Sequence, residues 1–217
     1  SYWALGQLIL DGHLDPENLA ASLAQGRIFG IGASVRRFLA NRQAGLPWHQ
    51  AGPHSAGNGA LMRIAPVLLT YLAHGGADLF VDAALCTMIT HNDAAAISCS
   101  VAWVAMLWEL LDMARPPSAD WWLDRYVRAA RDLEGEAMYA PRCPAFAGYR
   151  GPLWRFTAER IAWATQTGLD TLVACNTWHS GAYLLETMPS VLYILMRYAD
   201  DPEEAIVPAS PTSPLAG

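Results

Sequence analysis

The segment SAGNGALMR, residues 55–63, brings together residue types that can bind a phosphate or a sugar. Glycines on both sides of Asn58 allow positive φ angles and a close approach of the backbone to a ligand. A helix that begins near Ala60 would direct its free N–H groups and its positive dipole end at this loop, an arrangement that binds anions. Ser55 and Asn58 would add hydrogen bonds to sugar hydroxyls. The alternative is a turn followed by an ordinary N-cap.

The elements around this segment are predicted to be helices. Apolar residues recur at helical spacing along almost the whole chain, and no segment alternates with period two. Short helices of varied length indicate an all-α, compact, orthogonally packed multi-helix domain. Residues 139–153, which contain three prolines, are predicted to be irregular. The first predicted helix ends at Gly12, and a last one runs from Asp201 to about Ile206. The helices between them are predicted over residues 15–26, 33–45, 60–73, 78–90, 93–114, 118–135, 155–166 and 183–199.

Composition excludes several classes of protein. The 217 residues are 53% hydrophobic and 16% charged, which is far from the composition of disordered chains. A net charge of −6 argues against a nucleic-acid partner, because phosphate-backbone binding needs basic surface. The longest uncharged run in a helix-like segment, residues 94–108, is shorter than the ~20 residues of a membrane span.

Cysteine spacing and the first residues bear on the compartment. The four cysteines are widely spaced and form no CxxC pair, so we expect free thiols in a reducing compartment. The opening SYWALGQLIL has no basic region and no cleavage site, and no signal peptide is predicted there. Both features indicate a cytoplasmic protein.

The order S-x-G-N-G-A-x-M-R-I-A-P in residues 55–66 resembles the signature of the ADP-ribosylglycohydrolase family. Further stretches are similar to this family and follow in its order: GRIFGIGASVRRFL, TMITHND, GAYLLETMPSVLYIL and DPEEAI. The resemblance implies an all-α enzyme that removes ADP-ribose from modified side chains or related compounds. It predicts one domain over residues 1–206, incomplete at both ends, and a disordered tail over the Pro- and Ser-rich residues 207–217.

The resemblance also implies a substrate-binding set. The loop of residues 55–59 would line the diphosphate and the ribose. The segment around Ile31 would form another wall of the site, and Tyr183 would lie near the adenine. A capping or core histidine is the alternative for His91, and a helix-core side chain is the alternative for Tyr183. Catalytic residues remain unknown. The implied substrate-binding residues are Ser55, Gly57, Asn58, Gly59, His91, Gly30, Ile31, Gly32 and Tyr183.

Family members hold two magnesium ions with a Thr-Asp-Asp and an Asp-x-Asp-Thr element, because hard cations need several converging oxygen ligands. This sequence contains neither element. Asp93 is a single acid beside His91, and Glu186 is either a site residue or a partly exposed helix carboxylate. Magnesium is therefore implied by the family, while no metal ligand is predicted in this chain.

Weak or absent activity is expected from a chain without those elements. The sequence represents either an incomplete copy or an evolutionary loss of the metal motifs. The alternatives to a hydrolase are a non-catalytic ADP-ribose or nucleotide binder, and a structural helical protein that self-associates through exposed core residues. The ADP-ribosylated target cannot be read from the sequence.

Overall fold

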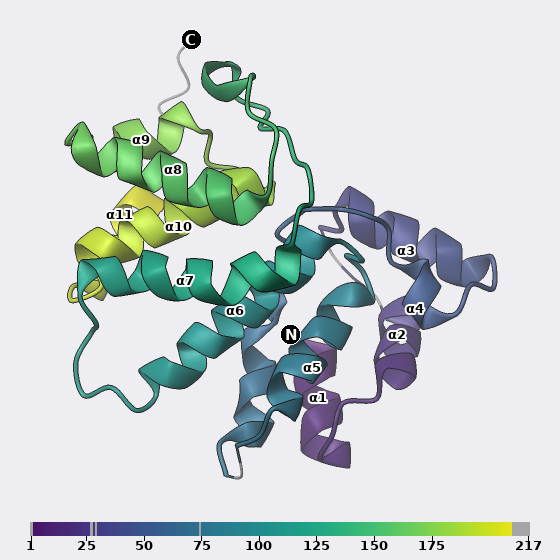
Figure 1. Cartoon of the computed structure of the whole chain (residues 1–217). Coiled ribbons are helices and arrows are strands. Elements are labelled where there is room, and N and C mark those ends of the chain that lie inside the picture. The colour runs from purple at the N-terminus through teal and green to yellow at the C-terminus, as the bar shows by residue number, and fades with distance from the viewer. Residues whose placement is uncertain (1, 27, 29, 74, 210–217) are drawn as a thin grey trace. The chain divides into compact units, whose positions relative to one another are not determined.

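The computed structural model describes residues 2–26, 28, 30–73 and 75–209 (Figure 1). Over these ranges the chain is helical and contains no strand, which confirms the all-α prediction. Two compact units, Ser1–Trp108 and Glu109–Gly217, divide the chain. That both units belong to one domain over residues 1–206 stays a prediction. The helices are α1 (Tyr2–Asp11), α2 (Pro16–Gln25), α3 (Ala33–Gln43), α4 (Trp48–Ala51), η1 (Leu61–Arg63), η2 (Ala65–Tyr71), α5 (Asp78–Met88), α6 (Ala94–Leu110), α7 (Ala119–Glu134), η3 (Pro144–Phe146), α8 (Leu153–Gln166), α9 (Thr171–Thr177), α10 (Leu184–Tyr198) and α11 (Pro202–Ala209).

The end of α1 and both ends of α2 lie within one residue of the predicted positions. α1 ends at Gly12, whose φ of 71° is a conformation that glycine adopts without strain. Asp15 is the N-cap of α2, because its Oδ1 accepts hydrogen bonds from the N–H groups of Glu17 (2.9 Å) and Asn18 (3.1 Å). Pro16 occupies the first turn, where its missing N–H costs nothing.

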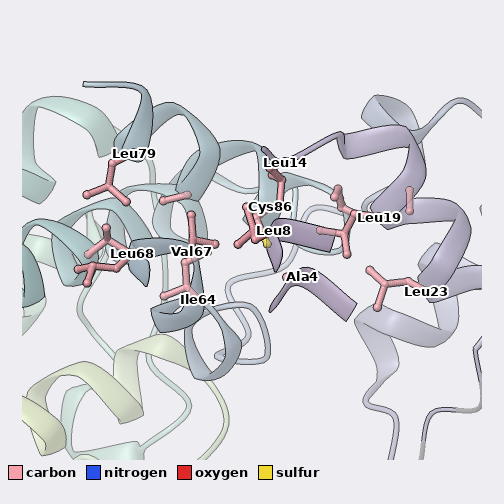
Figure 2. Close-up of a cluster of buried hydrophobic side chains, with 14 of the residues drawn as sticks. Ala4, Leu8, Leu14, Leu19, Leu23, Ile64, Val67, Leu68, Leu79 and Cys86 are labelled. Carbon is pink, nitrogen blue, oxygen red and sulfur yellow. The ribbon is translucent and has the colours of Figure 1, made fainter. Parts of the chain in front are cut away.

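The core of the first unit brings α1, α2, η2 and α5 together. Figure 2 shows Leu8 of α1 near Cys86 of α5, and Val67 and Leu68 of η2 close by. Leu19 of α2 extends the same cluster. All these side chains are buried. The cluster anchors η2, and the chain shortly before η2 contains residues 55–59, which we call the glycine-rich loop.

The predicted helix over residues 60–73 is wrong. The chain there forms two short 3-10 helices, η1 and η2, with three-residue hydrogen bonds such as Ile64 N–H to Leu61 O (3.3 Å) and Val67 N–H to Ile64 O (3.0 Å). Pro66 explains the difference, because it has no N–H and its ring would clash with the carbonyl four residues earlier in an α-helix. The three-residue repeat still buries Ile64 and Val67, while Met62 is 75% exposed.

α5 and α6 confirm the predicted pair of helices on either side of THND. The Oδ1 atom of Asp93 accepts hydrogen bonds from the N–H groups of Ala95 (3.0 Å) and Ala96 (3.4 Å), so Asp93 caps α6. α6 has 17 residues, and no helix in the described ranges combines the length and the apolar character that crossing a bilayer requires.

The second unit is organised around α10, which packs against α7, α8, α9 and α11 (Figure 1). Trp178 is fully buried beside this helix, and its indole Nε1 donates a hydrogen bond to Ser190 Oγ (2.9 Å). The buried carboxylate of Glu134, at the end of α7, accepts hydrogen bonds from the N–H groups of Leu153 and Trp154. Glu134 thus caps α8 and fixes where residues 139–153 return to helix.

The structure also differs from the sequence predictions in several short segments. α4 and α9 were not predicted, although Asp170 gives α9 an N-cap by accepting the N–H of Leu172 (2.9 Å). Residues 139–153 are largely irregular, as predicted, and contain η3 and an isolated bridge between Tyr139 and Gly151. α11 continues to Ala209, so the predicted tail is helical over residues 207–209, and its remainder lies outside the described residues.

Candidate functional site

The glycine-rich loop, residues 55–59, lies against the imidazole of His91. A Cβ atom on Gly57 would lie 3.3 Å from His91 Nε2, and one on Gly59 would lie 3.1 Å from Cε1 and 3.3 Å from Nε2. A side chain at either position would therefore crowd the buried ring, which approaches the backbone closely here. The expectation that the glycines provide positive φ angles is wrong, since neither Gly57 nor Gly59 has one.

Hydrogen bonds connect this loop to two other segments of the family signature. Ser55 Oγ lies 2.7 Å from Ser34 Oγ, at the start of α3. The N–H of Asn92 donates to Pro53 O (3.0 Å), which joins the loop to the residue after His91. Three stretches that are distant in the sequence thus meet in the first unit.

The segment that precedes α3 contains the wall residues that the resemblance implies. Gly30 is exposed with a φ of 64°, a left-handed conformation that favours glycine. The Ile31 carbonyl accepts a hydrogen bond from Arg36 (2.8 Å), and Gly32 is the N-cap of α3. Gly30, Ile31 and Gly32 therefore lie within a few residues of Ser34, the contact of Ser55.

The expected helix N-terminus beside the loop is absent. η1 has only three residues, and the N–H of Met62 already donates to Asn58 O (3.0 Å). A helix macrodipole needs several aligned α-helical turns, and this segment has none. An anion at the loop would therefore meet single N–H groups and the half-buried side chains of Ser55 and Asn58 in place of a helix dipole.

Arg63 lies beneath the loop. Its guanidinium donates hydrogen bonds to Gly59 O (3.3 Å), to Cys86 O (3.3 Å) and to the hydroxyl of Thr90. Burial lowers the pKa of Arg63 from its usual value, because the interior disfavours the charged form. Arg63 is not among the predicted site residues, although the Met-Arg pair directly after the loop is part of the motif that carries the resemblance.

His91 is both a buried histidine and a neighbour of the loop. The residue is 3% exposed, its N–H donates to Thr87 O (3.0 Å), and its Nδ1 lies 2.9 Å from the hydroxyl oxygen of Thr90. Burial, together with the positive charge of Arg63, lowers the pKa of His91 to about 4. The ring is therefore neutral at physiological pH.

Tyr183 and Glu186 belong to the second unit. Tyr183 is the N-cap of α10, so the helix-core alternative does not hold, and the Arg142 guanidinium lies 4.6 Å from its ring centroid. Glu186 is buried and caps α10 by accepting the Tyr183 N–H (3.4 Å), so it is not a partly exposed helix carboxylate. Arg142 also lies 4.0 Å from Glu186. The Arg142 guanidinium therefore covers one face of the Tyr183 ring in a cation–π contact.

The carboxylates of the described residues do not fit a pair of magnesium ions. Within these ranges no group of three or more His, Cys, Asp or Glu side chains could hold a metal ion. Asp93 and Glu186 each accept backbone N–H groups at the start of a helix. Two Mg²⁺ ions need several carboxylates at one place, which these residues do not provide.

The fold and the loop define a class of protein: an all-α chain in which a glycine-rich loop closes against a buried histidine. A family model described as ADP-ribosylglycohydrolase matches residues 3–210, nearly the whole chain. The chain therefore belongs to the ADP-ribosylglycohydrolase family. Comparisons with curated proteins and with solved structures give no match.

Proposed function

We propose that this chain binds ADP-ribose, or the ADP-ribosyl group of a modified molecule, at the glycine-rich loop beside His91. The observation that carries the proposal is the meeting of three signature segments, around Ser34, Ser55 and His91, in one part of the first unit. Family membership supports an ADP-ribosylglycohydrolase-like function in general. The proposal goes further by naming the residues that meet the ligand.

The chemistry of the loop suits a diphosphate and a ribose. Ser55 and Asn58 carry hydroxyl and amide groups, which donate to phosphate oxygens and exchange hydrogen bonds with sugar hydroxyls. Arg63 adds a positive charge beneath the loop, where a partly buried setting strengthens its attraction for a diphosphate. Gly30, Ile31 and Gly32, which lie close to Ser34 in the same unit, would form another wall of the site.

Hydrolysis is proposed to be weak in this chain. The family implies magnesium, which would polarise the ribose and supply an activated water, but the described carboxylates do not fit two such ions.

The cysteines bear on the predicted compartment, and exposed apolar residues of α1 bear on the predicted self-association. All four cysteines are buried, and Cys86, Cys143 and Cys175 are free thiols, which supports a reducing, cytoplasmic compartment. Ile9 and Leu10 of α1 are 71% and 84% exposed, which supports self-association. Gel filtration at increasing concentration tests the self-association, and a constant monomeric elution volume would contradict it.

Titration calorimetry with ADP-ribose tests the proposed function. We expect binding by the wild-type chain, at least a tenfold loss of affinity in Asn58→Ala, and no loss in the control Asn176→Ala, an exposed asparagine of α9. Magnesium should leave the affinity unchanged. No binding heat at millimolar ADP-ribose would refute the proposal, and a strong gain with magnesium would refute the absence of metal ligands.

A further inference from the structure

We propose that Arg63 and Thr90 are positioning residues that hold His91 in one neutral tautomer, with the proton on Nε2 and that N–H turned to the glycine-rich loop. The proposal rests on the proposed function in one respect, namely that the Nε2–H group donates to a hydroxyl or phosphate oxygen of the ligand. The tautomer itself follows from contacts within the protein.

The chain of contacts begins at Arg63, which has only donor groups. Its guanidinium donates to the hydroxyl oxygen of Thr90. That oxygen therefore acts as an acceptor, and the hydroxyl hydrogen must go to another group. His91 Nδ1 lies 2.9 Å from the same oxygen and can accept this hydrogen only if Nδ1 is unprotonated. A neutral imidazole then carries its proton on Nε2.

The other protonation states are disfavoured by the burial of Thr90, whose exposed area is 0%. If Nδ1 carried a proton, in the other neutral tautomer or in the imidazolium, it would donate to Thr90. The hydroxyl oxygen would then accept two hydrogen bonds. In the described part of the chain, Arg63 and His91 are the residues to which the Thr90 hydroxyl is bonded, so its hydrogen would be left buried without an acceptor.

The Nε2 edge of the ring faces the loop. Gly57 and Gly59 both lie against this edge, since an added Cβ atom on either glycine would lie only 3.3 Å from Nε2. Nε2 is therefore the ring nitrogen that faces the loop. A ligand oxygen is an acceptor and matches an N–H donor at that place. An imidazole fixed on Thr90 also loses little rotational freedom when it donates, because its orientation is already set.

Nitrogen NMR of ¹⁵N-histidine-labelled protein reads the tautomer directly. We expect His91, identified as the signal missing from His91→Gln, to show a protonated Nε2 and an unprotonated Nδ1 at pH 7. A protonated Nδ1 in the wild-type chain would overturn the proposal. This measurement needs no ligand, so its outcome is separate from that of the proposed function.

Substitutions at Thr90 test the source of the tautomer. Thr90→Val keeps the shape and removes the hydroxyl, and we expect a mixture of tautomers, while Thr90→Ser keeps the hydroxyl and should keep the wild-type signals. Thr87→Val is the matched control: Thr87 is equally buried, and its hydroxyl donates to Ala83 O (2.9 Å) instead of to the ring. An unchanged tautomer in a folded Thr90→Val, or a lost tautomer in Thr87→Val, would contradict the assignment.

ADP-ribose affinity tests the role of the positioned N–H. We expect Thr90→Val to bind about tenfold more weakly and Thr90→Ser and Thr87→Val to bind like the wild type. Equal affinities of Thr90→Val and the wild type would refute the donor role. Failure of the wild-type chain to bind ADP-ribose would refute the proposed function, and the NMR result would then still decide the tautomer.

Discussion

Acidification is expected to destabilise the wild-type chain more than a His91→Gln variant. The pKa of His91 is lowered from 6.5 to about 4 in the folded chain, because burial and the charge of Arg63 disfavour the imidazolium. The unfolded chain therefore binds a proton more readily between pH 6.5 and 4. The contribution of the neutral ring to stability is present above pH 6.5 and is lost as the pH falls to 4. The difference between the pKa values of His91 in the unfolded and folded chain corresponds to about 3 kcal/mol in the free energy of unfolding.

Urea unfolding at a series of pH values, followed by circular dichroism, measures this effect. The difference in unfolding free energy between wild type and His91→Gln should shrink by about 3 kcal/mol from pH 7 to pH 4. Taking the difference cancels the carboxylates that both proteins share. His54→Gln, at an exposed position in the same loop region, is the control and should follow the wild type. Parallel curves for wild type and His91→Gln would refute the buried neutral imidazole.

Two further predictions concern one close contact in each unit. Gly59→Ala places a Cβ 3.1 Å from His91 Cε1 and should lower the unfolding free energy by about 1–3 kcal/mol. The control Gly148→Ala, whose Cβ would have nothing within 4 Å, should change it by less than about 0.5 kcal/mol. Equal effects of the two substitutions in thermal or urea unfolding would contradict the role of the ring. Glu134→Ala removes the carboxylate that caps α8 and should cost about 1–3 kcal/mol, and the same loss in the exposed control Glu136→Ala would show that the cap is not its cause.

Local signals predicted most of the helices. Asp15 with Pro16, and Asp93 before α6, are caps whose hydrogen bonds form within three residues, so the sequence carries the whole signal. The same signal at Asp170 marks α9 and was overlooked. Residues 60–73 were predicted as an α-helix because Ile64 and Val67 suit either helix type, whereas Pro66 permits the 3-10 form and excludes a continuous α-helix.

The meeting of the glycine-rich loop with His91 was predictable from the sequence, whereas the contacts between them were not. The motif order placed Ser55 and His91 in one functional set, and the structure brings their segments together. The reason for Gly57 and Gly59 was not predictable, since it depends on a ring more than 30 residues away in the sequence. Arg63 was missed for the same reason: its hydrogen bonds to Cys86 and Thr90 exist only once α5 packs against η2.

Binding of ADP-ribose at the glycine-rich loop can be followed by titrating ADP-ribose into histidine-labelled protein, because the imidazole of His91 lies against that loop. We expect the His91 signals to shift in a saturable way, with Nε2 the more affected ring nitrogen, while those of exposed His49 stay in place. Saturable binding that leaves the His91 signals unchanged would contradict binding at this loop.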